Sequence, residues 1–316
     1  MIPKKYFVAL MVPAVFAIGF ASAKIYGEYR QKPTNIFNRP QPEAAKVKWM
    51  RDTLVEVYPF HIDGELQFCG EPVPLNDVDV RERLDRELQI NVFRQASTIL
   101  DMKLANRYFD TIEKILVEEG VPADFKYLPL IESDFRDVVS PSGAAGFWQF
   151  LAPTAKTYGL EVNEAVDERY HLEKSTRAAC QYLKLAKDKL GSWTAAAASY
   201  NFGIDGVAGK FKTQRTSNYY DLAITSETSR YVFRMLAMKV IFMNPERAGY
   251  HVIESDLYQP ISYTTVEVDT PITDLAEFCS ASGIRYKELK QLNPWLRNTS
   301  LPNKNKKVYQ VKILKK

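Results

Sequence analysis

Apolar residues recur at helical spacing through the middle of the chain. Between residues 90 and 120 they return every three or four positions, and Gly120 then ends the pattern. The same spacing recurs in residues 172–192 and in residues 225–246, where Thr and Ser, which are good N-cap residues, open the segment. This pattern predicts a mainly α-helical domain over residues 81–250.

The periodicity changes near residue 251. Apolar and polar residues alternate over residues 263–270, as in a β-strand, and residues 307–316 are predicted to form a second strand. Between them lie two short helical patterns, at residues 272–283 and 286–294. The sequence therefore predicts a small second domain with a βααβ order over residues 251–316.

The first residues have the pattern of a targeting segment. Two lysines precede an apolar run from Tyr6 to Ala21, and an A-x-A-like site ends at Ala23. This predicts a signal peptide over residues 1–23 and export to the periplasm or cell envelope. The alternative is an uncleaved anchor that associates with the membrane, although the run is slightly short for a span of about 20 residues. Residues 24–80, rich in proline and polar residues, are expected to form a linker and then an extended arm.

Charge and composition narrow the classes of function. The net charge of +4, from 42 Lys and Arg against 38 Asp and Glu, is too weakly basic to favour nucleic-acid binding. The three cysteines lie far apart without a C-x-x-C spacing, and the three histidines are isolated. This spacing predicts no metal site, and no cofactor is expected. The oligomeric state stays open.

Glu132 is the candidate for acid chemistry. It falls near the C-terminus of a short predicted helix, distorted by Pro129, and both the helix dipole and its apolar flank favour a raised carboxyl pKa. Such an acid can protonate the leaving oxygen of a glycosidic bond. Neither Asp134 nor Asp137 is fixed beside it by spacing, so a reaction with one carboxylate requires that the substrate supply the nucleophile. The alternative is an ordinary helix-end glutamate.

Three motifs in order resemble one family. The stretch ESDFRDVVSPSGAAGFWQF, residues 132–150, resembles the E-S…S-x-S-x-A-x-G-[LF]-[MW]-Q core of soluble-type lytic transglycosylases, whose fold is shared with goose-type lysozymes. ASYNFG, residues 198–203, resembles their A-Y-N-x-G motif, and SETSRYV, residues 226–232, resembles their E-T-x-x-Y-V motif. The sequence departs from the family at Ser199, where alanine is usual, and at residues 204–205, where Pro-Gly is usual.

The resemblance implies a lysozyme-like helical fold and a role for each matched residue. Glu132 would be the acid and then the base of the reaction. The matched substrate-binding residues are Ser140, Ser142, Trp148, Gln149, Tyr200, Asn201 and Tyr231. Taken without the resemblance, the two serines would be turn formers and Tyr231 would be a core aromatic, while Trp148 fits the core and the groove equally.

The C-terminal unit resembles a degenerate LysM module, in which Val268-Asp269-Thr270 stands for the usual G-D-T. This implies that it binds peptidoglycan glycan strands, and the alternative is a plain packing domain. The whole chain is thus expected to be a lytic transglycosylase. It would cleave the β-1,4 bond between N-acetylmuramic acid and N-acetylglucosamine and leave a 1,6-anhydromuramic end. A lysozyme-type hydrolase and a non-catalytic peptidoglycan-binding protein are the alternatives.

Overall fold

The structure is a computed structural model, and it describes residues 58–315. The predicted signal peptide and most of the predicted linker lie outside the described residues. Among the described residues, no helix is both long enough and apolar enough to cross a membrane. The part of the predicted arm that is described pairs β1 (Gln67–Phe68) with β2 (Glu71–Pro72) in an antiparallel hairpin.

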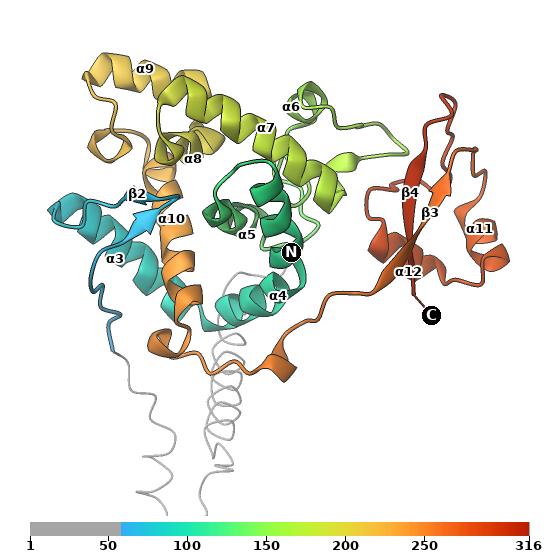
Figure 1. The fold of residues 1–316 in the computed structure, drawn as a ribbon, viewed down its shortest axis with the longest axis horizontal. Coiled ribbons are helices and arrows are strands. Elements are labelled where there is room, and N and C mark those ends of the chain that lie inside the picture. Colours follow the sequence, from blue (N-terminus) through green and yellow to red (C-terminus); the bar gives the residue numbers. More distant parts are fainter. Residues whose placement is uncertain (1–57, 316) are drawn as a thin grey trace, which may run out of the picture. The chain divides into compact units, whose positions relative to one another are not determined.

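The middle of the chain is helical, as the periodicity predicts (Figure 1). The helices are α3 (Val78–Phe93), α4 (Gln95–Glu118), α5 (Tyr127–Ser133), α6 (Ala152–Thr157), α7 (Leu172–Leu190), α8 (Trp193–Phe202), α9 (Ile204–Gln214) and α10 (Ser226–Met243). Short 3-10 turns occur at Ala123–Lys126, Glu168–Tyr170, Tyr219–Asp221, Glu246–Ala248 and Glu254–Asp256. The side chain of Ser192 accepts a hydrogen bond from the backbone of Ala195 and thereby caps α8.

One detail of the helical pattern differs from the expectation. The continuous pattern from residue 90 to residue 120 is divided between α3 and α4, which meet at Arg94. Ile99 and Leu100 belong to that pattern, yet they are 36% and 37% exposed. Both residues lie in α4, beyond the break, so helical spacing alone does not decide which apolar positions of this helix are buried.

Helix α10 is the centre of the helical domain. It packs against α3, α8 and α5, and Figure 1 shows it running between α3 and α5. Eight of its apolar residues are almost completely buried; they are Tyr231, Val232, Phe233, Met235, Leu236, Ala237, Met238 and Ile241. The helix therefore links the elements that carry the candidate motifs.

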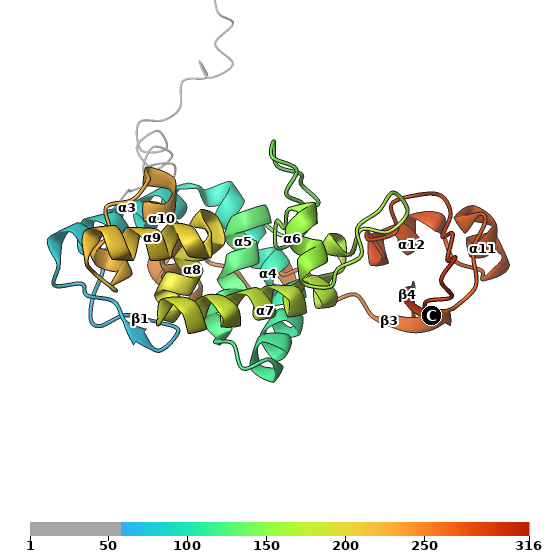
Figure 2. The same cartoon turned by 90° about the horizontal axis from the view of Figure 1, so that it is seen from above.

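The C-terminal residues form the predicted βααβ unit. Strand β3 (Tyr263–Val268) pairs antiparallel with β4 (Tyr309–Leu314), with Tyr263 opposite Leu314 and Val268 opposite Tyr309. Between them come α11 (Leu275–Ala281) and α12 (Tyr286–Leu292), which Figure 2 shows on one side of the strand pair. A mainly α architecture with a small βααβ unit is thus confirmed, while the domain boundary at residue 250 stays a prediction.

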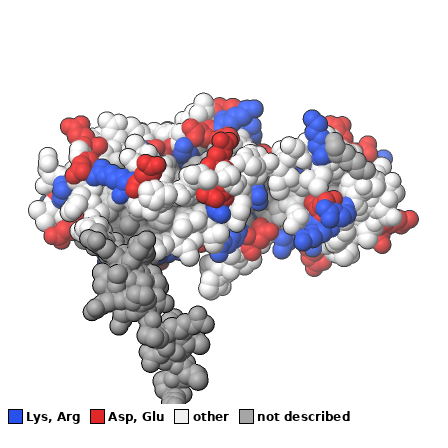
Figure 3. Space-filling view, turned by 90° about the horizontal axis from the view of Figure 1, so that it is seen from below, with Lys and Arg blue, Asp and Glu red and all other residues white. Residues whose placement is uncertain are grey.

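Charged side chains are mixed over the surface. Figure 3 shows basic and acidic groups interspersed on the face that it presents. Such mixing keeps a protein soluble without creating a large field of one sign.

Candidate active site

Glu132 lies in the last turn of α5, where the sequence predicts it. The chain turns sharply just after it, because Asp134 and Phe135 adopt left-handed backbone conformations with φ of 48° and 55°. Ser133 fixes this turn to the loop that follows: its hydroxyl donates to the carbonyls of Pro129, at 3.0 Å, and Phe147, at 2.9 Å. Glu132 itself is half-buried and reaches solvent.

The surroundings of Glu132 favour its protonated form. Burial raises the pKa of this carboxyl, while the hydrogen bond from Tyr231 and the charge of Arg234 oppose the rise and the charge of Glu227 adds to it. Among the described residues, Arg234 and Glu227 are the charged groups that bear on this pKa, and the nearby Asp134 and Asp137 are not. A carboxyl with a raised pKa suits a proton donor.

Tyr231 joins α10 to the acid. Its hydroxyl donates a hydrogen bond to Oε1 of Glu132, and its ring is 2% exposed. The sequence left open whether Tyr231 packs in the core or serves the site, and in the structure it is buried with its hydroxyl on the candidate acid. Because α10 is rigidly packed, this contact also fixes the position of the carboxylate.

Arg234 is a residue that the sequence reasoning missed. It lies three positions after Tyr231 on α10, so it projects from the same side of the helix. Its Nη2 donates to the carbonyl of Ile131 at 2.7 Å, and its charge lowers the pKa of Glu132. The spacing from Tyr231 is the signal that could have found it.

The loop between α5 and α6, residues 134–151, is held largely by its own polar groups. Oγ of Ser140 and Oγ of Ser142 are 2.9 Å apart, and Oγ of Ser140 also accepts from the backbone of Ala144 at 3.0 Å. Nε2 of Gln149 donates to the carbonyls of Gly146, at 2.8 Å, and Val138, at 3.1 Å. The serines and the glutamine thus shape this loop, and their exposed surface stays available to a ligand.

Trp148 supports the loop from inside. It is 0% exposed, and its indole Nε1 donates to Oγ1 of Thr176 on α7 at 2.9 Å. Its own carbonyl accepts from the hydroxyl of Tyr200 on α8 at 2.8 Å. Of the two roles that the sequence left open for Trp148, the structure shows the core role. It leaves no Trp148 surface for a sugar.

Asn201 links the second motif to the third. Its amide nitrogen donates to Glu227 at 3.1 Å, and its amide oxygen accepts from the hydroxyl of Thr228 at 2.7 Å. Both partners lie in the first turn of α10, which Thr225 caps. The three predicted motifs therefore meet around Glu132, although they are far apart in sequence.

Comparisons with known proteins identify the family that two regions of the chain resemble. Residues 111–223 match the model of the transglycosylase SLT domain, and residues 264–316 match that of the soluble lytic transglycosylase C-terminal LysM-like domain. The chain carries a transglycosylase SLT domain followed by a LysM-like domain. These matches confirm the family resemblance that the motifs indicate and, with the helical architecture, the lysozyme-like fold class.

Two curated relatives extend the likeness over most of the chain. Membrane-bound lytic murein transglycosylase D is 28% identical over 305 residues, both in Escherichia coli K12 and in Escherichia coli O6:H1. The match covers 93% of this chain but 65% of those proteins, so this chain spans a little under two thirds of their length. A putative tributyltin chloride resistance protein of an Alteromonas species, strain M-1, is 31% identical over 101 residues, which is 31% of this chain and 49% of that protein.

One solved structure is a more distant match. It is an inactive mutant of the lytic transglycosylase Slt from Pseudomonas aeruginosa, with 18% identity and a TM-score of 0.33. The match covers 48% of this chain and 26% of that chain. At this level of similarity it carries no argument about the present site.

Proposed function

We propose that this protein is a peptidoglycan lytic transglycosylase with Glu132 as its acid and base. It would cleave the β-1,4 bond between N-acetylmuramic acid and N-acetylglucosamine. The observation that carries the proposal is the half-buried Glu132 with a raised pKa, held by Tyr231 at the meeting point of the three motifs. The names of the Escherichia coli relatives support the same substrate class.

In the first step Glu132 would protonate the leaving oxygen, which requires the carboxylic acid form. The N-acetyl oxygen of the substrate would stabilise the positive anomeric carbon. In the second step the Glu132 carboxylate would take the proton from the C6 hydroxyl, whose oxygen closes the 1,6-anhydro ring. The proton returns to Glu132 and no water is consumed, so a second carboxylate to activate water is unnecessary.

Five polar residues of the motifs that retain solvent-accessible surface are the proposed sugar contacts. They are Ser140, Ser142, Gln149, Tyr200 and Asn201. Trp148 and Tyr231 would act from beneath, the first by supporting the loop and the second by positioning the acid. The LysM-like domain is the proposed glycan-binding module.

The test uses purified peptidoglycan and reads the products by mass. Wild type should give muropeptides that are lighter by one water than hydrolysis products. Glu132→Gln keeps the shape but not the proton relay, so its rate should fall at least about a hundredfold, the scale of general acid–base catalysis. Glu82→Gln, on the exposed face of α3, is the matched control and should keep the rate. Hydrated ends from wild type would identify a lysozyme-type hydrolase, and full activity in Glu132→Gln would refute the mechanism.

The substrate also implies a location. We propose that the protein is exported through residues 1–23 and works in the cell envelope, since peptidoglycan lies outside the cytoplasm. N-terminal sequencing of the envelope-derived protein should find Lys24 first. An intact Met1 in the membrane fraction would instead show that the segment is retained as an anchor.

A further inference from the structure

The LysM-like domain does not complete its core alone. Nine of its residues form a buried cluster with four residues of the helical domain, which are Ala145, Ala165, Val166 and Tyr170. Trp295 lies at this contact: its ring stacks on His171 and on Tyr309, with centroids 5.9 Å and 5.6 Å apart. One of the four, Ala145, belongs to the loop between α5 and α6 that carries the proposed sugar contacts. The two domains therefore share a core.

The backbone also crosses from one domain to the other. The amide of Asp167 donates to the carbonyl of Trp295 at 2.9 Å, and the amide of Arg297 donates to the carbonyl of Ala165 at 2.9 Å. Val166 and Leu296 form an antiparallel bridge between these bonds. A backbone ladder of this kind fixes the register of both segments, so the domains are joined in one defined position.

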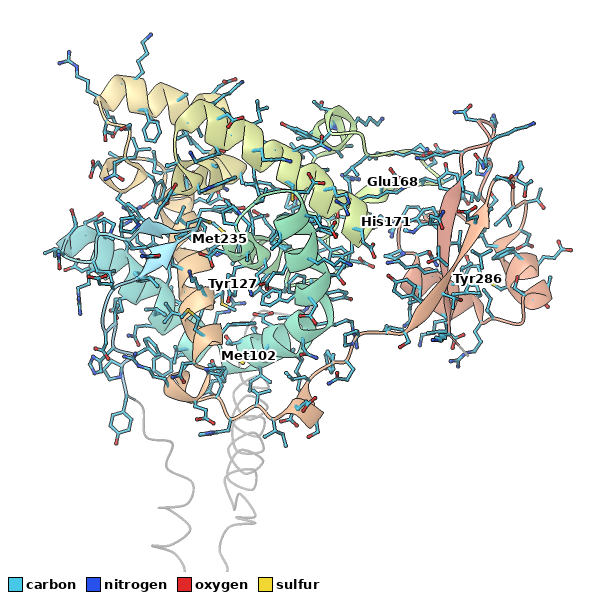
Figure 4. All side chains as sticks on the ribbon, viewed as in Figure 1. Met102, Tyr127, Glu168, His171, Met235 and Tyr286 are labelled. Carbon is cyan, nitrogen blue, oxygen red and sulfur yellow. The ribbon has the colours of Figure 1, made fainter. Side chains whose placement is uncertain are left out.

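Ion pairs hold the two ends of this contact. Nζ of Lys312 on β4 lies 2.5 Å from Glu173 at the start of α7. Nζ of Lys307 lies 2.8 Å from Glu161 and 3.3 Å from Glu168. Figure 4 labels Glu168 near the beginning of α7, on the stretch that leads into that helix. The Lys312–Glu173 pair is well shielded, with side chains 17% and 26% exposed, so it contributes more than a typical surface pair.

The same segment holds the active-site loop. Asp167 accepts hydrogen bonds from the guanidinium of Arg169, including one at 2.7 Å from Nη2. Nη1 of Arg169 in turn donates to the carbonyls of Gly143, at 2.9 Å, and Phe150, at 3.0 Å. The loop backbone approaches so closely that a Cβ on Gly146 would lie 2.0 Å from the carbonyl oxygen of Arg169. Residues 165–169 thus contact the LysM-like domain on one side and the loop on the other.

We propose that the LysM-like domain is a fixed part of the catalytic unit that positions the loop beside Glu132, in addition to any glycan binding. Glu173 and Lys312 are then positioning residues, because they clamp the segment that holds the loop and do not themselves touch the reacting sugar. The catalytic part of this inference rests on the proposed function. The structural part, that the domain contact orders residues 140–150, does not.

The experiment exchanges the charges of one pair in the full chain. The variants are Glu173→Lys, Lys312→Glu and the double exchange, with Lys287→Glu, on the exposed face of α12, as the charge-matched control. Lys312→Met removes the charge but keeps an unbranched side chain of similar length. It takes the place of a single variant that does not fold. Circular dichroism sets a temperature at which every variant is folded. Amide hydrogen exchange of residues 140–150 and kcat/KM on short soluble glycan fragments are then measured.

Each single variant should exchange faster in residues 140–150 and lose about tenfold in kcat/KM, the scale of a small displacement of catalytic groups. The double variant, in which the two charges are swapped, should restore most of the amide protection and most of the kcat/KM. The control Lys287→Glu should change neither quantity. Unchanged amide exchange in folded single variants would overturn the proposal, and so would faster exchange with an unchanged rate. A failure of the proposed function would be recognised separately, because wild type would then give no anhydro product. The amide-exchange measurement would still test whether the domain contact orders residues 140–150.

Discussion

The helical domain and the LysM-like domain close their cores in different ways. The helical domain buries its aromatic and aliphatic residues around α10, with Trp148, Phe125 and Phe233 fully enclosed. The LysM-like domain uses Trp295, and its buried cluster is completed by residues of its neighbour. A short chain buries a smaller fraction of its surface than a long one does, so a unit of this size gains most from a shared core. The difference shows that a domain with a recognisable sequence pattern need not be an independent structural unit.

The two regions also differ in the direction in which they shift the pKa of a carboxyl group. In the helical domain, burial raises the pKa of Asp101 to about 7, the charge of Asp134 adds to the rise, and Oδ1 of Asp101 has no hydrogen-bond partner among the described residues. At the domain contact, burial also disfavours ionised Glu173, but His171 and Lys312 outweigh it and hold its pKa well below the usual range. The helical domain should therefore lose stability as pH rises, and the domain contact should lose it as pH falls.

The largest effect should come from separating the regions. Removal of residues 261–316 would expose the apolar surface of Val166 and Tyr170 and leave the amide of Asp167 without its partner. We expect a lower melting temperature for the remaining domain and a loss of at least about tenfold in turnover on short soluble fragments. Thermal unfolding by circular dichroism and a fragment assay measure the two effects. Undiminished stability and turnover would show that the domains are independent, as a simple wall anchor would be.

The next effect concerns Asp101, which is 5% exposed. Its folded pKa of about 7 lies above the ordinary value of 3.8, so its contribution to stability is complete below about pH 4 and is lost as pH rises to about 7. At about 1.4 kcal/mol for each pKa unit, the loss is at most about 4 kcal/mol. Asp101→Asn is neutral at every pH and should remove this part of the pH dependence. Urea unfolding at several pH values measures the difference from wild type.

Asp188→Asn, on the exposed side of α7, provides the control for that series and should follow wild type. If Asp101→Asn and wild type lose stability in parallel between pH 4 and 8, then Asp101 is not the group that titrates.

The smallest expected effect comes from a change at the candidate acid that leaves both hydrophobic cores intact. Tyr231→Phe keeps the packing of α10 but removes the hydroxyl that donates to Glu132. Because this hydrogen bond lowers the pKa of Glu132, its loss should raise that pKa further and move the alkaline limb of the rate profile to higher pH. A hydrogen bond to the protonated carboxyl contributes about 0.5–1.5 kcal/mol, so kcat should fall by about two- to tenfold.

The pH–rate profile on short soluble fragments gives both quantities. Tyr286→Phe, on α12, is the control and should match wild type. A shift of the alkaline limb toward lower pH in Tyr231→Phe would contradict the role assigned to the hydroxyl.

Much of the architecture could be read from local patterns. Helical spacing predicts α7 and α10, and alternation predicts the β3–β4 pair, because these periods depend on neighbouring residues alone. The break between α3 and α4 at Arg94 could not be read in this way, since residues on both sides of it fit one helical period. The direction in which each helix packs, which depends on distant partners, decides where such a pattern divides.

The candidate site likewise combines features that the sequence predicts with features that only the tertiary packing decides. The sequence by itself determined the candidate acid, Glu132, and the three motifs that resemble one family, because residue type and order along the chain are local properties. Only the tertiary structure decided that Trp148 is enclosed, that Arg234 acts on the acid, and that Glu173 and Lys312 join the two domains. Burial, and the approach of polar groups that lie 103 and 139 residues apart in the chain, are properties of packing. No local pattern of residues records them.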